Sequence, residues 1–254
     1  MKFIKFCCVV ILLVITTISN SLIAADYYWV GNSGNWNDAS GTFQAAGGTV
    51  TLSGGNSDIT TGGSNYFSAL TVDATGTKTA QSDLDINGNF TLTAGTFAPG
   101  SNGVEVAGNW SNSGTFTAGS GTVTFNGAGS QSLTPGSSSF YNLTTATSST
   151  NVTLQADITV TNDLTIGSGT TLDVSGSNYA IGISGNFANS GTFTDQAGTV
   201  TFNGTGTLTS GGSELYNVTT NGTGTVTLGD ALTIANDLTI GANTTLDAGS
   251  NRDI

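Results

Sequence analysis

The stretch Gly108–Gly127, GNWSNSGTFTAGSGTVTFNG, decides how this chain is organised, because it returns at Gly185–Gly204 as GNFANSGTFTDQAGTVTFNG. Fifteen of the 20 positions are identical, at a displacement of 77 (185 − 108). A more divergent copy begins at Gly34 as GNWNDASGTF and continues through Thr49–Leu52 (TVTL). The unit therefore occurs three times. We place the copies at residues 34–107, 108–184 and 185–254, the last one incomplete.

The second half of the unit repeats as well. Val152–Asp173 (VTLQADITVTNDLTIGSGTTLD) matches Val226–Asp247 (VTLGDALTIANDLTIGANTTLD) at 14 of 22 positions with a displacement of 74 (226 − 152). Where residues differ, apolar positions stay apolar: Ile158 corresponds to Leu232 in the next copy. The apolar positions are therefore what the fold requires.

Within each copy the hydrophobic period is two. Segments such as Thr122–Phe125 (TVTF) and Leu164–Ile166 (LTI) alternate an apolar residue with threonine, which places the apolar side chains on one face of a strand. Clusters of Gly, Ser and Asn separate these segments and are typical of tight turns. No window after residue 25 has helical spacing. We expect an all-β protein.

A shorter period lies inside the long one. Gly88-Asn89-Phe90 recurs as Gly108-Asn109-Trp110, at a displacement of 20 (108 − 88). A period near 20, made of short strands and glycine corners, favours one turn of a parallel β-helix, or β-solenoid, with three or four turns per copy. The alternative is a string of antiparallel β-sandwich domains of ~75 residues. The inner period, and the position of Pro99 and Pro135 inside copies instead of in linkers, favour the solenoid.

The first residues have the layout of a secretory signal peptide. Lys2 and Lys5 precede an apolar run at residues 6–15, and small residues at Ala24-Ala25 follow. The run is shorter than the ~20 residues of a membrane span, so we expect residues 1–25 to be removed, and no membrane insertion of the mature chain. Residues 26–37, DYYWVGNSGNWN, concentrate aromatic side chains and are interpreted as an N-terminal cap of the repeat array.

Charge and cysteine content narrow the function classes. Both cysteines precede the expected cleavage site, so the mature chain has no disulfide and no cysteine metal site. Lys78 and Arg252 are its only basic residues against 16 acidic ones, which gives a net charge of −14 (2 − 16). Nucleic acid is therefore a poor partner, because phosphate binding needs clustered Lys and Arg.

The last residues align with the start of a strand in the preceding copy. Residues 250–254 (SNRDI) match residues 177–181 (SNYAI), where an apolar segment continues to Ile183. A solenoid that stopped there would leave its core and strand edges uncovered. We therefore expect the third copy to be truncated in this sequence.

Acidic residues provide two weak candidates for chemistry. Asp83, Asp85 and Asn87 form the D-x-D-x-N-G start of a calcium loop, but the pattern requires Glu at the twelfth position, where Ala94 stands. Asp83 and Asp85, ~6.6 Å apart on a strand, have a spacing compatible with an inverting glycosidase. However, the chain has no His and few cations. Four aspartates recur at the repeat spacing and are interpreted as turn residues: Asp163, Asp173, Asp237 and Asp247. We expect no catalytic, cofactor or metal site.

Thr-x-Thr pairs raise the alternative of an ice-binding surface. The pairs Thr115/Thr117 and Thr122/Thr124 are separated by a displacement of only seven (122 − 115), less than one turn, so they are not expected to stack on one face. Threonine on the outer face of a strand is favoured simply because it suits β structure and keeps the surface soluble.

Taken together, these motifs resemble those of bacterial secreted β-strand-repeat proteins, the adhesin-like and autotransporter-passenger-like β-helices. The resemblance rests on Tyr28–Gly31 (YWVG), on GTVTFNG, and on Tyr-Asn-Leu/Val-Thr at residues 141–144 and 216–219. It implies a non-catalytic secreted or outer-surface protein, a stalk or binding module for extracellular glycans or cell surfaces. The alternative is a structural fibre or matrix built from copies stacked end to end. A carbohydrate-active enzyme is a weaker alternative.

Overall fold

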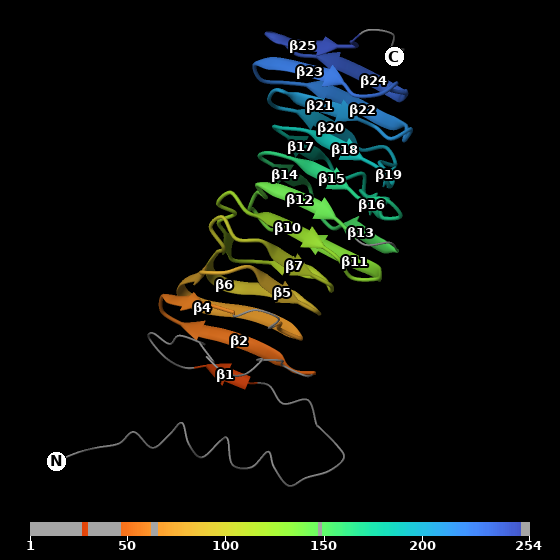
Figure 1. Ribbon diagram of the computed structural model, residues 1–254. Helices are drawn as coiled ribbons and strands as arrows, with labels where there is room; N and C mark the ends of the chain where they lie inside the picture. Colours follow the sequence, from red (N-terminus) through yellow and green to blue (C-terminus); the bar gives the residue numbers. More distant parts are fainter. Residues whose placement is uncertain (1–26, 30–46, 62–65, 147–148, 250–254) are drawn as a thin grey trace, which may run out of the picture.

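The computed structural model describes residues 27–29, 47–61, 66–146 and 149–249, and in these residues the chain winds into an elongated β-solenoid (Figure 1). Every pairing between described strands is parallel, and no described residue is helical. The predicted parallel β-helix is confirmed, and the antiparallel sandwich is excluded. The expected signal peptide, most of the expected cap and residues 250–254 lie outside the described residues.

The first sheet has 11 strands and extends along most of the molecule. Its strands, in order of pairing, are β1 (Tyr27–Trp29), β2 (Thr49–Gly54), β4 (Ala69–Ala80), β6 (Phe90–Ala98), β8 (Trp110–Asn112), β11 (Gly129–Thr134), β13 (Thr150–Leu154), β16 (Thr171–Asp173) and β19 (Thr192–Thr194), with β3 (Ser57–Ile59) paired to β4 and β9 (Thr115–Phe116) paired to β6.

The second sheet has nine strands and the third has five. The second sheet consists of β5 (Leu84–Ile86), β7 (Val104–Val106), β10 (Thr122–Phe125), β12 (Asn142–Thr145), β15 (Leu164–Ile166), β18 (Phe187–Asn189), β21 (Gly206–Thr209), β23 (Gly224–Leu228) and β25 (Thr244–Asp247). The third sheet consists of β14 (Ile158–Val160), β17 (Ile181–Ile183), β20 (Thr199–Phe202), β22 (Leu215–Thr220) and β24 (Ile234–Ile240).

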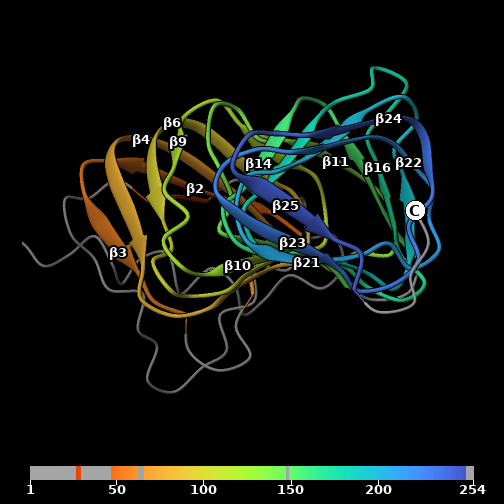
Figure 2. The ribbon, with the colours of Figure 1, turned by 90° about the horizontal axis from the view of Figure 1, so that it is seen from above.

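These sheets form three sides around one core, as the end view in Figure 2 shows. In the N-terminal half, β3, β9 and the second halves of β4 and β6 take the third side. The ring of Phe116 on β9 lies 5.7 Å from that of Phe140, and Phe140 pairs with Val160 of the third sheet. The same side therefore continues from β9 into the third sheet.

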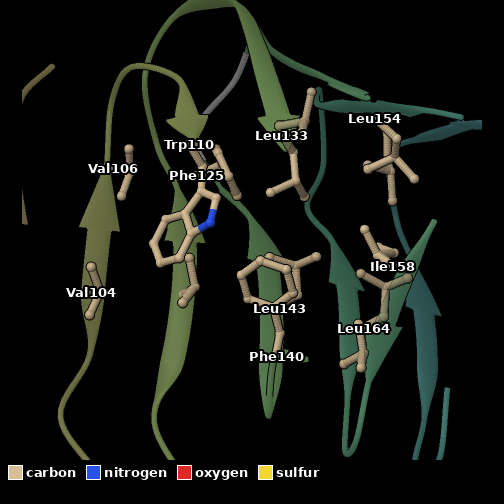
Figure 3. Packing of buried hydrophobic residues seen from close by; sticks show 14 of the residues in the cluster. Val104, Val106, Trp110, Phe125, Leu133, Phe140, Leu143, Leu154, Ile158 and Leu164 are labelled. Carbon is tan, nitrogen blue, oxygen red and sulfur yellow. The ribbon is translucent and has the colours of Figure 1, made fainter. Parts of the chain in front are cut away.

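The core consists of apolar rows that run from turn to turn. On the second sheet one row passes through the paired residues Leu84, Val104, Val123, Leu143, Leu164, Phe187, Leu208 and Leu228, all of which are buried. Figure 3 shows part of this packing, with Trp110 and Phe140 reaching into the same interior as Leu133 and Leu143. The predicted inward apolar positions are thus confirmed, because alternation places every second residue of a strand inside.

Polar networks inside the solenoid repeat together with the sequence. The buried Asn112 donates from Nδ2 to Pro135 O (2.8 Å) and accepts from Gly114 N (3.0 Å). Its counterpart in the next copy, Asn189, donates to Ser210 O (2.7 Å) and accepts from Gly191 N (3.0 Å). Both sets satisfy the same corner groups, so each copy folds into the same local unit.

Candidate functional site

The most regular feature of the outer surface is a column of threonines on the first sheet. Thr51 on β2 pairs with Thr71 on β4, which pairs with Thr91 on β6. Each alternates with buried neighbours along its strand and points outward, half-buried. Three hydroxyls are therefore stacked at the spacing of neighbouring strands, ~4.8 Å.

The same column occurs on the other two sides. On the second sheet Thr124, Thr144 and Thr165 are paired in register on β10, β12 and β15. On the third sheet Thr201, Thr219 and Thr239 are paired on β20, β22 and β24. We call the three columns the threonine triads. Their first members are displaced by 73 (124 − 51) and then by 77 (201 − 124), so the triads are the repeat copies seen on the surface.

The triads lie on different sides because a copy is not a whole number of turns. From Trp110 on β8, three successive turns lead through β11 and β13 to β16. The counterpart of Trp110 in the next copy is Phe187 on β18. From β16 on the first sheet, the chain passes through β17 on the third sheet before it reaches β18 on the second, which adds two of the three sides of a turn. One copy therefore spans about three and two-thirds turns, which agrees with the expected three or four. Each successive triad is rotated by about one side.

Amide side chains flank two of the triads in the same way. On the second sheet Asn142 accepts from Asn162 Nδ2 (2.8 Å) and donates to Thr122 Oγ1 (3.2 Å). On the third sheet Asn217 accepts from Asn236 Nδ2 at 2.8 Å. Each of these two surfaces thus combines three hydroxyls with amide groups held by neighbouring turns. Groups of this kind donate to and accept from other neutral polar molecules.

The threonine pairs considered for ice binding do lie on different parts of the solenoid. Thr115 on β9 pairs with Thr96 on β6, whereas Thr122 and Thr124 are on β10 of the second sheet. Yet threonines from successive turns do align, which the short spacing of those pairs did not reveal. The second column ends at Ala188, which pairs with Thr165. A further column, Thr77, Thr96 and Thr115, is paired in register on the second halves of β4 and β6 and on β9. The hydroxyls thus form several short patches on three sides instead of one long flat array.

The aspartates of the calcium-like motif border a shallow acidic depression on the second sheet. Asp83, Asp85 and Glu105 line it with Thr122 and Thr124, and its volume is about 210 Å³. Asp83 accepts from Gly103 N (2.7 Å) and Glu105 accepts from Asn126 Nδ2 (2.8 Å). Partial burial raises the pKa of Asp85 above its ordinary value. The carboxylates of Asp83 and Glu105 are thus engaged in holding adjacent turns.

Of the four recurring aspartates, Asp237 is wrongly predicted as a turn residue: it lies inside β24, where it pairs with Asn217. The other three hold corners or neighbouring turns. Asp173 Oδ1 accepts from Ser175 N and Asp247 Oδ1 from Gly249 N, both at 2.8 Å and both two residues ahead. Asp163 Oδ1 accepts from Asn186 N (2.8 Å) on the next turn. For Asp173 and Asp247 the interpretation as turn residues is confirmed, whereas Asp163 holds two turns of the solenoid together. Within the described part of the chain, no group of three or more acidic residues is arranged to hold a metal ion.

Two ionisable side chains that the sequence did not single out are buried. Lys78 is fully buried in an inward position of β4, and its Nζ donates to Ser53 O (2.7 Å) and Gly55 O (2.6 Å). Burial lowers the pKa of Lys78. Asp195 is 8% exposed and accepts from Tyr216 N; burial, with a contribution from Glu214, raises its pKa. Neither the Asp195 carboxylate nor the Lys78 amine faces an open surface, so both side chains have a structural role.

The fold and the surface define the class of protein, a parallel β-solenoid built from a long internal repeat with neutral polar patches on three sides. No described helix is long and apolar enough to span a membrane. No protein-family model, curated protein or solved structure matches the chain. Inference about its function therefore rests on its own residues.

Proposed function

We propose that this is a non-catalytic exported or cell-surface repeat protein, a stalk or binding module whose threonine triads contact extracellular glycans or cell surfaces. The observation that supports the proposal is the recurrence of one surface unit on three sides. The outward residues on the turn before a triad differ between copies: Glu105 pairs with Thr124, the first threonine of the second triad, whereas Gly182 pairs with Thr201, the first threonine of the third. Threonine occupies all nine triad positions.

The chemistry of the triads suits neutral polysaccharides. Hydroxyl and amide groups exchange hydrogen bonds with sugar hydroxyls without needing opposite charge. Single contacts of this kind are weak because they replace hydrogen bonds to water. Three equivalent patches along one rod compensate for this, since a long polymer that engages more than one patch gains from effective concentration.

The test compares binding of the mature chain, residues 26–254, to insoluble cellulose, chitin and xylan. Thr→Val at all three positions of a triad removes the hydroxyls while keeping the side-chain shape; Thr→Ser at the same positions is the matched control. We expect binding to fall when one triad carries Val and to disappear when all three do, with the Ser variants close to the parent. Equal binding by the nine-Val variant, shown to be folded by circular dichroism, would contradict the proposal.

A further inference from the structure

A tyrosine stands beside the middle strand of the second threonine triad and another beside that of the third. Tyr141 comes immediately before Asn142, the first residue of β12, and Tyr216 is its counterpart in β22, at a displacement of 75 (216 − 141). The inward residues around Tyr141 are Phe140 and Leu143, both buried. In a regular strand inward residues are two positions apart, and here they are three apart. The chain therefore turns a corner with two consecutive side chains, Tyr141 and Asn142, on the outside.

Neither tyrosine ring is part of the core. Tyr141 and Tyr216 are half-buried, but neither is among the described side chains that pack against the core cluster, whereas Tyr179 is. Among the described residues, neither phenol hydroxyl has a hydrogen-bond partner and neither ring contacts another aromatic ring. A tyrosine that stabilises a fold usually does so by burying its ring and pairing its hydroxyl. These two side chains are instead available at the surface.

The two rings have the same surroundings. On the turn before Tyr141, Gly121 lies beside it, since Thr122 and Asn142 are paired, and Gly121 O accepts from Asn142 N at 3.4 Å. On the following turn, Asn162 donates from N to Tyr141 O (2.9 Å) and from Nδ2 to Asn142 Oδ1 (2.8 Å). A glycine therefore leaves one side of the ring without a covering side chain, and amide groups border the other. The corresponding residues of the third copy are Gly198, Asn217 and Asn236.

The first copy shows that the fold does not require the ring. Ser68 stands at the position of Tyr141, at a displacement of 73 (141 − 68), and Ala69 follows it. Phe67 and Leu70, on either side of this pair, are buried as in the later copies. The corner is thus kept with two small side chains. The first triad therefore has neither an aromatic ring nor an amide at this edge.

We propose that Tyr141 and Tyr216 are the stacking platforms of two sugar-binding subsites, which take neutral polysaccharides whose sugars expose a face of C–H groups. The face of a tyrosine ring is negatively polarised and attracts such C–H groups. Asn142 and Thr144 lie outward on β12, two residues apart, and exchange hydrogen bonds with the sugar hydroxyls. β12 lies between β10 and β15, which carry the other two threonines of this triad (Figure 1).

This inference rests on the proposed binding role of the threonine triads and adds which triads dominate it. Aromatic side chains are enriched among the few residues that contribute most to a binding surface. The second and third triads each combine a ring, an amide pair and three hydroxyls, whereas the first has hydroxyls alone. The first triad therefore contributes less to binding.

The experiment measures binding of the mature chain, residues 26–254, to insoluble cellulose, chitin and xylan by depletion from solution. Tyr141→Ser and Tyr216→Ser introduce the residue that the first copy carries at this corner, so the fold should tolerate them. We expect the double Ser variant to bind roughly tenfold more weakly than the parent or worse. Tyr141→Phe and Tyr216→Phe are the matched controls and should bind like the parent, because they keep the rings. Circular dichroism checks that each variant is folded.

A gain of binding provides a second test. Ser68→Tyr combined with Ala69→Asn gives the first triad the ring and the amide of the later copies. Added to the double Ser variant, these two substitutions should restore part of the lost binding. Binding that stays at the level of the double Ser variant would contradict the proposed role of the ring.

The outcomes separate this inference from the proposed function. If the double Ser variant binds like the parent while valine in all three triads abolishes binding, the tyrosines are not platforms and the triads still bind. If the Phe variants lose as much binding as the Ser variants, the hydroxyl and not the ring makes the contact, and stacking is wrong. Failure of the parent to bind any of the three polysaccharides would overturn both proposals.

Discussion

Replacing Gly167 with alanine tests the close stacking of turns on which this fold depends. A Cβ added at Gly167 would lie 2.5 Å from Thr145 O, the carbonyl to which the Gly167 N–H donates at 2.9 Å. The ordinary limit for such a contact is about 3.4 Å, so the two turns must separate by roughly 0.9 Å (3.4 − 2.5). A shift of that size lengthens this hydrogen bond beyond the usual range.

The same movement disturbs a buried hydroxyl pair. Thr145 Oγ1 and Thr170 Oγ1 are 2.6 Å apart, and Thr170 also donates to Gly167 O at 2.7 Å. Losing one or two such bonds, and leaving a buried polar group unpaired, amounts to about 2–4 kcal/mol of unfolding free energy. We expect Gly167→Ala to lower stability by this amount.

Two further glycines act as controls. Gly176 has no heavy atom within 4 Å of an added Cβ and no left-handed φ, so Gly176→Ala should be neutral or stabilising by up to about 1 kcal/mol. Gly241, the counterpart of Gly167 on the last turn, would place its Cβ 2.6 Å from Thr220 O. Gly241→Ala should therefore also lower stability, by the same clash with the preceding turn.

Urea unfolding followed by far-UV circular dichroism measures the three variants. Because solenoid turns can unfold in stages, native-state hydrogen exchange should accompany it and locate the weakened turns around Thr145. Equal stability of Gly167→Ala and Gly176→Ala would refute the argument that glycine at this corner is required by the approach of the neighbouring turn.

Three further substitutions test the buried polar groups. Asp195→Asn keeps an acceptor for Tyr216 N and removes the buried charge, so it should raise the unfolding free energy at pH 7. This stabilisation should shrink as pH falls towards 3.8. The reason is that the pKa of Asp195 is raised in the native state, so the wild type becomes more stable as its carboxyl takes up a proton. The unfolding free energy of Lys78→Met, relative to wild type, should be most favourable near neutral pH and should decrease as pH rises towards 10.5. The reason is that the pKa of the buried amine is lowered in the native state, so the wild type becomes more stable as Lys78 loses its proton. A difference in unfolding free energy that stays constant with pH in urea titrations would contradict this. Trp110→Phe should change the unfolding free energy by no more than about 1 kcal/mol, since Phe187 fills the corresponding position and the buried indole N–H has no partner, whereas Trp110→Ala should lose about 3–5 kcal/mol in the same assay.

The strands and their inward and outward residues could be predicted from the sequence. Alternation in Thr122–Phe125 places Val123 and Phe125 inside, and they are buried there. The sequence also indicates the burial of Lys78, because Lys78 and the buried Ala80 are two residues apart in a segment whose residues alternate between inside and outside. Charge alone suggests a surface position, so the alternation was the more reliable indicator.

The grouping of threonines into triads could not be predicted, because it depends on the length of each turn. The displacement between paired residues is 19 for Val104 and Val123 (123 − 104), but 23 for Trp110 and Leu133 (133 − 110). The corners absorb these differences, and a small error in the length of each turn accumulates over a copy. The side on which a repeated motif falls is therefore visible only when the strand pairings are known.

The fractional number of turns per copy has a consequence for longer solenoids. Three copies at three and two-thirds turns each make about eleven whole turns, so the rotation between successive copies cancels after one set of three. At about 4.8 Å per turn this set has an axial length of ~53 Å. A solenoid that continued with this repeat would therefore present its next triad on the side of the first, displaced along the axis by that length.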